Sequence, residues 1–365
     1  MPPRVTVLMP VYNGLPYLRE AIESVLCQTF TDFEFLIVDD ASTDGSTDLI
    51  KSYGDSRIRL IRNEHNLGTS GSMNRGIELA CAEYIARIDQ DDVCLPERLR
   101  EQLAFIESRP DLEIVCSWEV GIDSSSRRIR NWTRQLDNYG AFLGYLVVGK
   151  CPIWHPSIMF RRQVVLEVGG YNHSYSPAED FELTMRLAMH RHSGGVVPKY
   201  LVMQRQHESR QSVQRESAQW AVTQRVHDKM IRKFYRASDA EPLGQFLRME
   251  DSFWRSCRSK EQIGNVLTAF HEMLRAMENE FRLSGEERTA LRWAVIRRLG
   301  LGSIWGRQIS RLPSLFFFPL FFSLSPMMVP GMRRLLSHFY EAAQELRYPA
   351  RLFRSSVKRL VNRGA

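Results

Sequence analysis

The chain has 365 residues, of which 44% are hydrophobic and 25% are charged. This composition excludes a collagen-like, low-complexity or disordered chain, and the length is enough for about two domains. The formal net charge of +7 is unevenly distributed, because residues 288–365 carry 14 Lys and Arg against 2 Asp and Glu, whereas residues 1–212 carry 23 against 28. We therefore expect the C-terminal end to meet an anionic partner.

Strand and helix patterns alternate over the first 120 residues. Short apolar or β-branched runs predict strands at Val5–Val11, Phe33–Val38, Ile58–Ile61, Tyr84–Ile88 and Ile114–Ser117. Apolar residues at helical spacing predict helices at Tyr17–Cys27, Ser46–Tyr53, Asn74–Ala80 and Pro96–Ser108. The alternation predicts an α/β fold with a Rossmann-like, mainly parallel sheet and helices on both faces. Such sheets bind ligands at the C-terminal ends of their strands.

The N-terminal strand and the cysteines bear on the compartment. Val5–Val11 is a short apolar stretch without the longer apolar region and small-residue cleavage site of a signal peptide. The six cysteines are scattered and none has C-x-x-C spacing, which argues against a zinc ribbon or a disulfide framework. We expect a reducing compartment, with the N-terminal domain in the cytoplasm.

Polar residues follow the first two predicted strands. Tyr12, Asn13 and Gly14 come after the first, where the tyrosine ring could stack on a base or pack within the protein. Asp39 and Asp40 end the second, where a carboxylate could accept hydrogen bonds from a base or a ribose, or the segment could cap the next helix. No G-x-G-x-x-G or P-loop pattern occurs there, which disfavours dinucleotide oxidoreductases and P-loop kinases.

The segment Asp89-Gln90-Asp91-Asp92 places three carboxylates within four residues after a predicted apolar strand. Their mutual repulsion favours a bound cation, and carboxylates suit a hard ion such as Mg²⁺ or Mn²⁺ that holds the phosphates of a nucleotide. The alternative is an acidic turn that caps the helix beginning at Pro96.

Two residues in the second half of the chain are further candidates. Asp180, at the start of a predicted helix, is either a helix cap or a general base that takes a proton from a hydroxyl. His207 lies in the polar loop Arg205–Ser212 and is either a structural polar residue or a third metal ligand.

Taken together, these segments resemble the family 2 glycosyltransferases with the GT-A fold. The matching text is V-T-V-L-M-P-V-Y-N-G from Val5, S-V-L-C-Q-T-F-T-D-F-E-F-L-I-V-D-D-A-S-T-D-G-S from Ser24, N-L-G-T-S-G-S-M-N-R-G-I from Asn66, E-Y-I-A-R-I-D-Q-D-D from Glu83, L-P-E-R-L from Leu95, H-P-S-I-M-F-R-R from His155 and A-E-D-F-E-L from Ala178. The resemblance covers about residues 4–212, and its motifs occur in the order of the family.

The resemblance implies a nucleotide-sugar donor, which we expect to be a UDP-sugar. Carried over by position, Pro10, Tyr12 and Asp40 line the nucleoside pocket. Asp39 stands beside them, and Asn13, next to Tyr12, is assigned to the same pocket.

The resemblance also implies a divalent metal, Mn²⁺ or Mg²⁺, and inversion at the anomeric carbon. Asp89 and Asp91 form the D-x-D pair, in which Asp91 binds the metal and Asp89 faces the ribose or the metal. Asp180 is the catalytic base that deprotonates the acceptor hydroxyl.

Two positions depart from the family pattern: Gln90, where a small residue is common, and Ala41, where glycine is common. Neither removes a carboxylate, so we expect the activity to be kept. Processive polysaccharide synthases of this family carry Q-x-x-R-W, and the nearest text here, Glu216–Trp220, lacks both the Gln and the Arg. A transferase that adds a single sugar is therefore favoured.

Two segments near the C-terminus have membrane character. Leu312–Met332 is 21 residues without a charge, long enough to span a bilayer, but it contains four prolines. An interfacial or re-entrant element, a buried hairpin and a true span stay open. Ala350–Val361 has one apolar and one basic helical face, which is typical of a helix on an anionic membrane surface or of a solvated helix packed on its own domain.

These observations predict a GT-A domain at residues 1–212, with a nucleotide-binding half at 1–120 and an acceptor half at 121–212. A mostly helical, basic and membrane-associating region follows at 213–365. We expect a glycan or lipid-linked acceptor in cell-surface polysaccharide synthesis, at the inner face of the cell membrane, and no nucleic-acid partner. The alternatives are a sugar-nucleotide nucleotidyltransferase and a non-catalytic membrane-associated scaffold.

Overall fold

The computed structural model describes residues 2–208, 210–236, 240–248, 250, 252–253 and 260–301, which belong to one compact unit comprising residues 1–313. The predicted membrane elements at 312–332 and 350–361 lie outside the described residues. Within the described part, no helix is both long enough and apolar enough to cross a bilayer.

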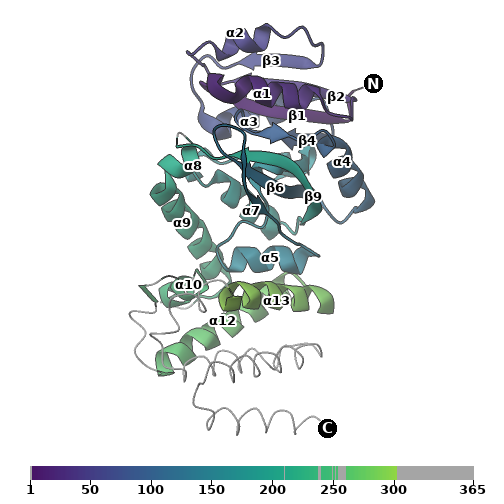
Figure 1. Ribbon diagram of the computed structural model, residues 1–365. Coiled ribbons are helices and arrows are strands. Elements are labelled where there is room, and N and C mark those ends of the chain that lie inside the picture. Colours follow the sequence, from purple (N-terminus) through teal and green to yellow (C-terminus); the bar gives the residue numbers. More distant parts are fainter. Residues whose placement is uncertain are drawn as a thin grey trace, which may run out of the picture. The chain divides into compact units, whose positions relative to one another are not determined.

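The strands of the described residues form one nine-stranded sheet, with helices packed around it (Figure 1). Its strands are β1 (Val5–Val11), β2 (Phe33–Asp39), β3 (Ile58–Arg62), β4 (Tyr84–Arg87), β5 (Val93–Cys94), β6 (Ile114–Ile122), β7 (Arg128–Trp132), β8 (Met159–Arg161) and β9 (Gly194–Arg205). The order is β3-β2-β1-β4-β8-β6-β9-β5, with β7 paired to β6. The first four strands in this order are parallel, β8 runs antiparallel to both of its neighbours, and β6 pairs parallel with β9. The predicted mainly parallel sheet is confirmed.

Helices surround the sheet and continue beyond it. They are α1 (Leu15–Leu26), α2 (Ser46–Lys51), α3 (Gly68–Leu79), α4 (Arg98–Ser108), α5 (Tyr139–Val147), α6 (Arg162–Glu167), α7 (Glu179–Met189), α8 (Gln211–Gln214), α9 (Glu216–Phe234), α10 (Glu241–Leu247), α12 (Lys260–Glu280) and α13 (Gly285–Leu301). Short 3-10 helices cover His155–Ser157 and His173–Tyr175. The predicted helical character of the segment after residue 212 is confirmed for α9, α10, α12 and α13.

The main core forms where the apolar face of α1 packs on β1 and β2. Leu18, Ile22 and Val25 recur at helical spacing and are buried against alternate strand residues such as Val7 and Phe35. Because the parallel strands run through this core, their C-terminal ends open together at one edge of the sheet, where the polar loops lie.

One helix–helix contact joins the sheet region to the last described helix. All nine residues of α5 are buried, and α13 packs on it (Figure 1). A Cβ atom on Gly140 would lie 1.8 Å from the carbonyl oxygen of Glu287, and one on Gly144 would lie 2.5 Å from the Cβ of Ala294. The two glycines therefore allow the backbones of the two helices to approach closely.

Candidate functional site

The predicted site residues gather at the C-terminal edge of the strand group β2-β1-β4. Tyr12 and Asn13 follow β1, Asp39 ends β2 and Asp40 follows it, and the segment Asp89–Asp92 follows β4. Since β1 lies between β2 and β4 in parallel register, the loops after the three strands are neighbours. The backbone therefore places these residues at one edge of the sheet, as the sequence predicts.

The two aspartates at the end of β2, Asp39 and Asp40, are buried, and the carboxylate oxygens of both accept hydrogen bonds from the chain. Asp39 accepts hydrogen bonds from the Ser42 backbone N–H (3.0 Å) and the Thr47 hydroxyl, and its carboxylate lies 3.3 Å from Nε of Arg62. Asp39 therefore joins the end of β2 to the following loop, to α2 and to β3.

Asp40 holds the start of α3. One carboxylate oxygen accepts from Asn63 Nδ2 (2.6 Å) and from the Leu67 backbone N–H (2.8 Å), and the other accepts from the Gly68 backbone N–H (2.9 Å). Leu67 is the N-cap of α3, so Asp40 satisfies backbone donors that a helix start otherwise leaves unpaired.

The loop after β1 presents an aromatic ring to solvent. Tyr12 is 46% exposed. Asn13 has a φ of 50°, a left-handed conformation that asparagine tolerates, and its Oδ1 accepts from the Thr43 backbone N–H at 2.9 Å. Pro10 is half-buried on β1, opposite Val38 of β2.

The acidic segment after β4 forms a cluster of carboxylates. Oxygen atoms of Asp89, Asp91 and Asp92 all lie within 4.8 Å of one another. Asp91 Oδ2 lies 2.8 Å from Nε2 of His207, so two predicted metal ligands 116 positions apart in the chain meet here. Asp92 is buried, and within the described residues its Oδ2 has no hydrogen-bond partner. Burial and the neighbouring charges of Asp91 and Asp89 raise the pKa of Asp92 well above its ordinary value.

A buried arginine, Arg87, was not among the predicted residues. Its guanidinium holds both carboxylate oxygens of Asp89, through Nη1 at 2.7 Å and through Nη2. Only 5% of the Arg87 side chain is exposed. This ion pair fixes the orientation of Asp89 within the cluster.

Asp180 stands at the second position of α7, with the buried Glu179 before it. Burial raises the pKa of the Asp180 carboxyl, a hydrogen bond from the Phe181 N–H and the charge of Arg87 oppose this rise, and the charge of Asp89 adds to it. Burial likewise raises the pKa of Glu179, whose Oε2 has no partner among the residues that the structure describes. The charges of Arg87 and Asp89 both act on the Asp180 carboxyl, so Asp180 lies within electrostatic reach of the segment after β4.

Arg205 is a second arginine that was not among the predicted residues, and it contacts the acidic segment through both its side chain and its backbone. Its side chain is fully buried and donates to the Asp91 backbone carbonyl (3.0 Å) and to Glu20 of α1 (2.6 Å), while its backbone N–H donates to Asp92 Oδ1 (2.8 Å). The Arg205 guanidinium also lies over the ring of Tyr17, 4.6 Å from its centroid, and that ring packs against His207 with centroids 5.0 Å apart. The only sequence signal was a charged residue at the end of an apolar strand.

A further buried carboxylate lies on β6. Glu119 is 1% exposed, its Oε1 has no partner within the described part of the chain, and burial raises its pKa from 4.5 to about 7. The alternation of the sequence in this region did not single it out.

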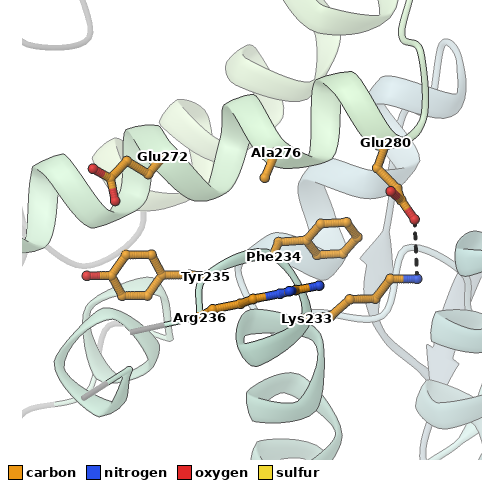
Figure 2. A pocket seen from close by; sticks show the side chains of 7 residues that line it. All are labelled: Lys233, Phe234, Tyr235, Arg236, Glu272, Ala276 and Glu280. Atoms are coloured by element: carbon orange, nitrogen blue, oxygen red, sulfur yellow. Dashed lines mark ion pairs between the residues drawn. The ribbon is translucent and has the colours of Figure 1, made fainter. Parts of the chain in front are cut away.

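A pocket of about 520 Å³ lies away from these carboxylates, between the end of α9 and α12. It is lined by Lys233, Phe234, Tyr235, Arg236, Glu272, Ala276 and Glu280 (Figure 2). Lys233 Nζ lies 3.8 Å from Glu280 Oε1 across its rim. The pocket contains none of the predicted site residues. Its lining carries both acidic and basic side chains and does not indicate a class of ligand.

Comparison with known proteins adds an independent line of evidence. Residues 6–169 match the model of the family Glycosyl transferase family 2. An uncharacterized glycosyltransferase of Methanocaldococcus jannaschii, MJ1057, is 30% identical over 207 residues, which cover 56% of this chain and 71% of that protein. TuaG of Bacillus subtilis, named for a glycosyltransferase of teichuronic acid biosynthesis, is 38% identical over 109 residues, which cover 29% of this chain and 43% of that protein.

Among solved structures, residues 1–349 of TarS from S. aureus in complex with UDP-GlcNAc have the same fold. The TM-score is 0.52 at 18% sequence identity, and the alignment covers 81% of this chain and 88% of that one. The sheet and its surrounding helices thus have a GT-A type fold. This chain belongs to glycosyl transferase family 2, as the sequence motifs indicated, and it is a transferase enzyme.

Proposed function

We propose that the chain is a metal-dependent, inverting glycosyltransferase that moves one sugar from a UDP-sugar to a hydroxyl group of a glycan or lipid-linked acceptor. The observation that carries the proposal is the contact of His207 with Asp91 of the carboxylate cluster, in a segment that Gln90 joins to the backbone of the exposed Tyr12. A base-stacking surface and a site for a cation that binds a diphosphate are what a nucleotide-sugar donor requires.

The donor atoms of the cluster suit Mn²⁺ or Mg²⁺. Carboxylate oxygens and one imidazole nitrogen are ligands that Mn²⁺ accepts, and Mg²⁺ prefers the oxygens. The buried Asp92 Oδ2, which has no partner among the described residues, adds a negative group whose burial is costly without a nearby positive charge. Asp91 and His207 would hold the ion, which would neutralise the charge of the departing diphosphate.

Asp180 is proposed as the general base. As the acceptor oxygen forms a bond to the anomeric carbon, the proton of the hydroxyl passes to the Asp180 carboxylate. The bond between the anomeric carbon and the phosphate oxygen breaks, and the nucleoside diphosphate leaves with the electron pair. Because attack comes from the face opposite the leaving group, the configuration inverts. The raised pKa of Asp180 makes this carboxylate a stronger base than an exposed one.

The donor and the pathway rest on similarity. TarS is solved with UDP-GlcNAc and TuaG is named for teichuronic acid biosynthesis, which supports a UDP-sugar donor and a role in cell-surface polysaccharide synthesis. The excess of basic residues over 288–365 supports a peripheral position at an anionic membrane surface, where lipid-linked acceptors lie.

The first experiment is a thermal-shift titration with a panel of nucleoside diphosphates, with and without Mn²⁺. Because ligand that binds the folded state raises Tm, a shift that needs both UDP and Mn²⁺ and is lost in Asp91→Asn supports the proposal. Asp111→Asn is the matched control, since Asp111 pairs with Arg109 before β6, outside the cluster. If the folded wild type shows no shift with any nucleotide, the donor assignment is wrong.

A further inference from the structure

Gln90, the middle residue of the D-x-D segment, makes a two-way bridge to the loop after β1. Its Nε2 donates to the Tyr12 carbonyl oxygen (3.0 Å), and its Oε1 accepts from the Tyr12 backbone N–H (2.8 Å). Both polar atoms of the side chain are therefore used on the backbone of a single residue that lies 78 positions earlier in the chain. The residue that departs from the family pattern thus has a defined structural partner.

Residues that follow β2 accept further hydrogen bonds from this loop. The backbone N–H groups of Asn13, Gly14 and Leu15 donate to Ser42 Oγ (3.1 Å), Ser46 Oγ (2.9 Å) and Asp44 Oδ2 (3.1 Å). Gln90 adds two hydrogen bonds from the segment that follows β4. The loop that carries the exposed ring is therefore held from both neighbouring strands.

We propose that Gln90 is a positioning residue of the donor site, which couples the Tyr12 backbone to the acidic segment so that the base and the diphosphate of one donor meet surfaces held at a fixed spacing. Gln90 stands between Asp89 and Asp91 in the chain, so any movement of the acidic segment is transmitted to Tyr12 through two hydrogen bonds. This inference rests on the proposed function, because the donor is what spans the two surfaces. Because both surfaces are held in place before the donor binds, less conformational entropy is lost on binding.

Gly14 provides the space that this bridge needs. A Cβ atom on Gly14 would lie 2.6 Å from Oε1 and 2.9 Å from Cδ of Gln90. The φ of Gly14 is −97°, which other residues adopt readily, so the backbone does not require glycine here. The requirement comes from the Gln90 side chain, and the two residues form a complementary pair.

The first test needs no nucleotide. Gly14→Ala and Gln90→Ala should lower Tm by similar amounts, a few degrees at most, because the methyl group added at position 14 displaces the flexible end of Gln90 and breaks the same two hydrogen bonds that Gln90→Ala removes. The double variant should lose no more than either single variant, because the bonds can be lost only once and the shorter side chain at position 90 leaves space for the methyl group. If the two losses add in the double variant, the pairing is refuted.

The second test measures UDP binding with saturating Mn²⁺ by calorimetry, together with donor KM and kcat. Gln90→Ala should weaken UDP binding and raise donor KM about five- to tenfold, while kcat and the affinity for Mn²⁺ alone stay within about twofold. Gln90→Glu should weaken binding too, since a carboxylate cannot donate to the Tyr12 carbonyl. The control is Gln135→Ala, which removes an exposed glutamine bonded to Asp137.

The outcomes of the two tests separate the inference from the function on which it rests. Wild type that binds UDP together with a Gln90→Ala variant that binds it equally well overturns the positioning role alone. Wild type that binds no nucleoside diphosphate overturns the donor assignment, and with it the positioning role.

Discussion

Asp40 and Asp92 are both buried aspartates at the same edge of the sheet, but their oxygen atoms are used in opposite ways. The two oxygens of Asp40 accept three hydrogen bonds from the start of α3 and from Asn63. One oxygen of Asp92 accepts a single bond from Arg205, and the other has no partner among the described residues. A carboxylate whose acceptor sites are filled by its own chain supports the fold, whereas one left open inside the protein is available to a ligand.

The same contrast separates the two sides of the candidate site. On the side of β2, the Asp39 carboxylate accepts hydrogen bonds from Ser42 in the loop that leads into α2 and from Thr47 of α2 itself. On the side of β4 and α7, burial raises the pKa of Asp92, Glu179 and Asp180, so these groups are held in surroundings that disfavour their charge. Groups of the second kind are typical of sites that perform chemistry. The following variants test whether the two sides differ as described.

The largest expected effect is on Asp180. Asp180→Asn should lower kcat by about a thousandfold or more, because an amide cannot accept the proton of the acceptor hydroxyl. Its Tm should stay close to that of the wild type, since the only side-chain bond of Asp180 within the described residues is to its neighbour Phe181. The measurement is the rate of sugar transfer to the acceptor by folded protein; activity above a tenth of wild type would contradict the assignment.

The second effect concerns the pair Asp91 and His207. Each single variant, Asp91→Asn and His207→Ala, should raise the Mn²⁺ concentration for half-maximal activity by about a hundredfold, since even indirect supports of metal ligands cost 10- to 100-fold. Titration of Mn²⁺ by calorimetry gives the same answer without turnover. Variants that bind Mn²⁺ as tightly as the wild type would show that the two side chains meet for structural reasons.

Asp40 should respond in stability first. Asp40→Ala leaves the N–H groups of Leu67 and Gly68 without their acceptor, and we expect a loss of about 3 kcal/mol in the free energy of unfolding. Urea unfolding measures it. If the folded fraction of the variant keeps its affinity for UDP, Asp40 acts through the fold; a separate loss of UDP affinity would support its predicted place in the nucleoside pocket.

Glu119 should give a smaller, pH-dependent effect. The folded protein keeps the proton of Glu119 up to about pH 7, whereas the unfolded chain releases it near 4.5. The folded state therefore binds more protons between these values, and stability falls as pH rises through this window. Glu119→Gln removes this dependence, so its stability relative to wild type should improve by about 2–3 kcal/mol between pH 4 and pH 8. Urea unfolding at several pH values measures this difference in the free energy of unfolding between the variant and the wild type. A difference that does not change with pH would contradict the raised pKa of Glu119.

The sequence predicts elements well where local patterns decide the structure. The predicted strand at Val5–Val11 has the observed bounds, because a β-branched run is buried on both faces. The helix predicted at Asn74–Ala80 instead begins at Gly68. Glycines and serines in its first turns are poor helix formers, and its first donors are capped by Asp40, which is distant in sequence.

The site shows the same division. The carboxylates could be predicted because an Asp directly after an apolar strand is visible in the sequence. The contact of Asp91 with His207 could not be predicted from the distance between the two residues along the chain. Arg87 and Arg205 could not be found in this way. A buried arginine resembles a surface arginine in sequence, and its partners are fixed only when separate strands come together. The predicted boundary at residue 212 remains a prediction.

The close packing of α13 on α5 has a practical consequence for anyone who shortens this chain. Every residue of α5 is buried, and Gly140 and Gly144 leave no room between its backbone and that of α13. A fragment ending at residue 212 would keep every carboxylate of the site but would turn one side of a wholly apolar helix to water, and it would aggregate. A catalytic fragment should therefore extend at least through Leu301, and exchange of the C-terminal helices between relatives should be accompanied by exchange of α5.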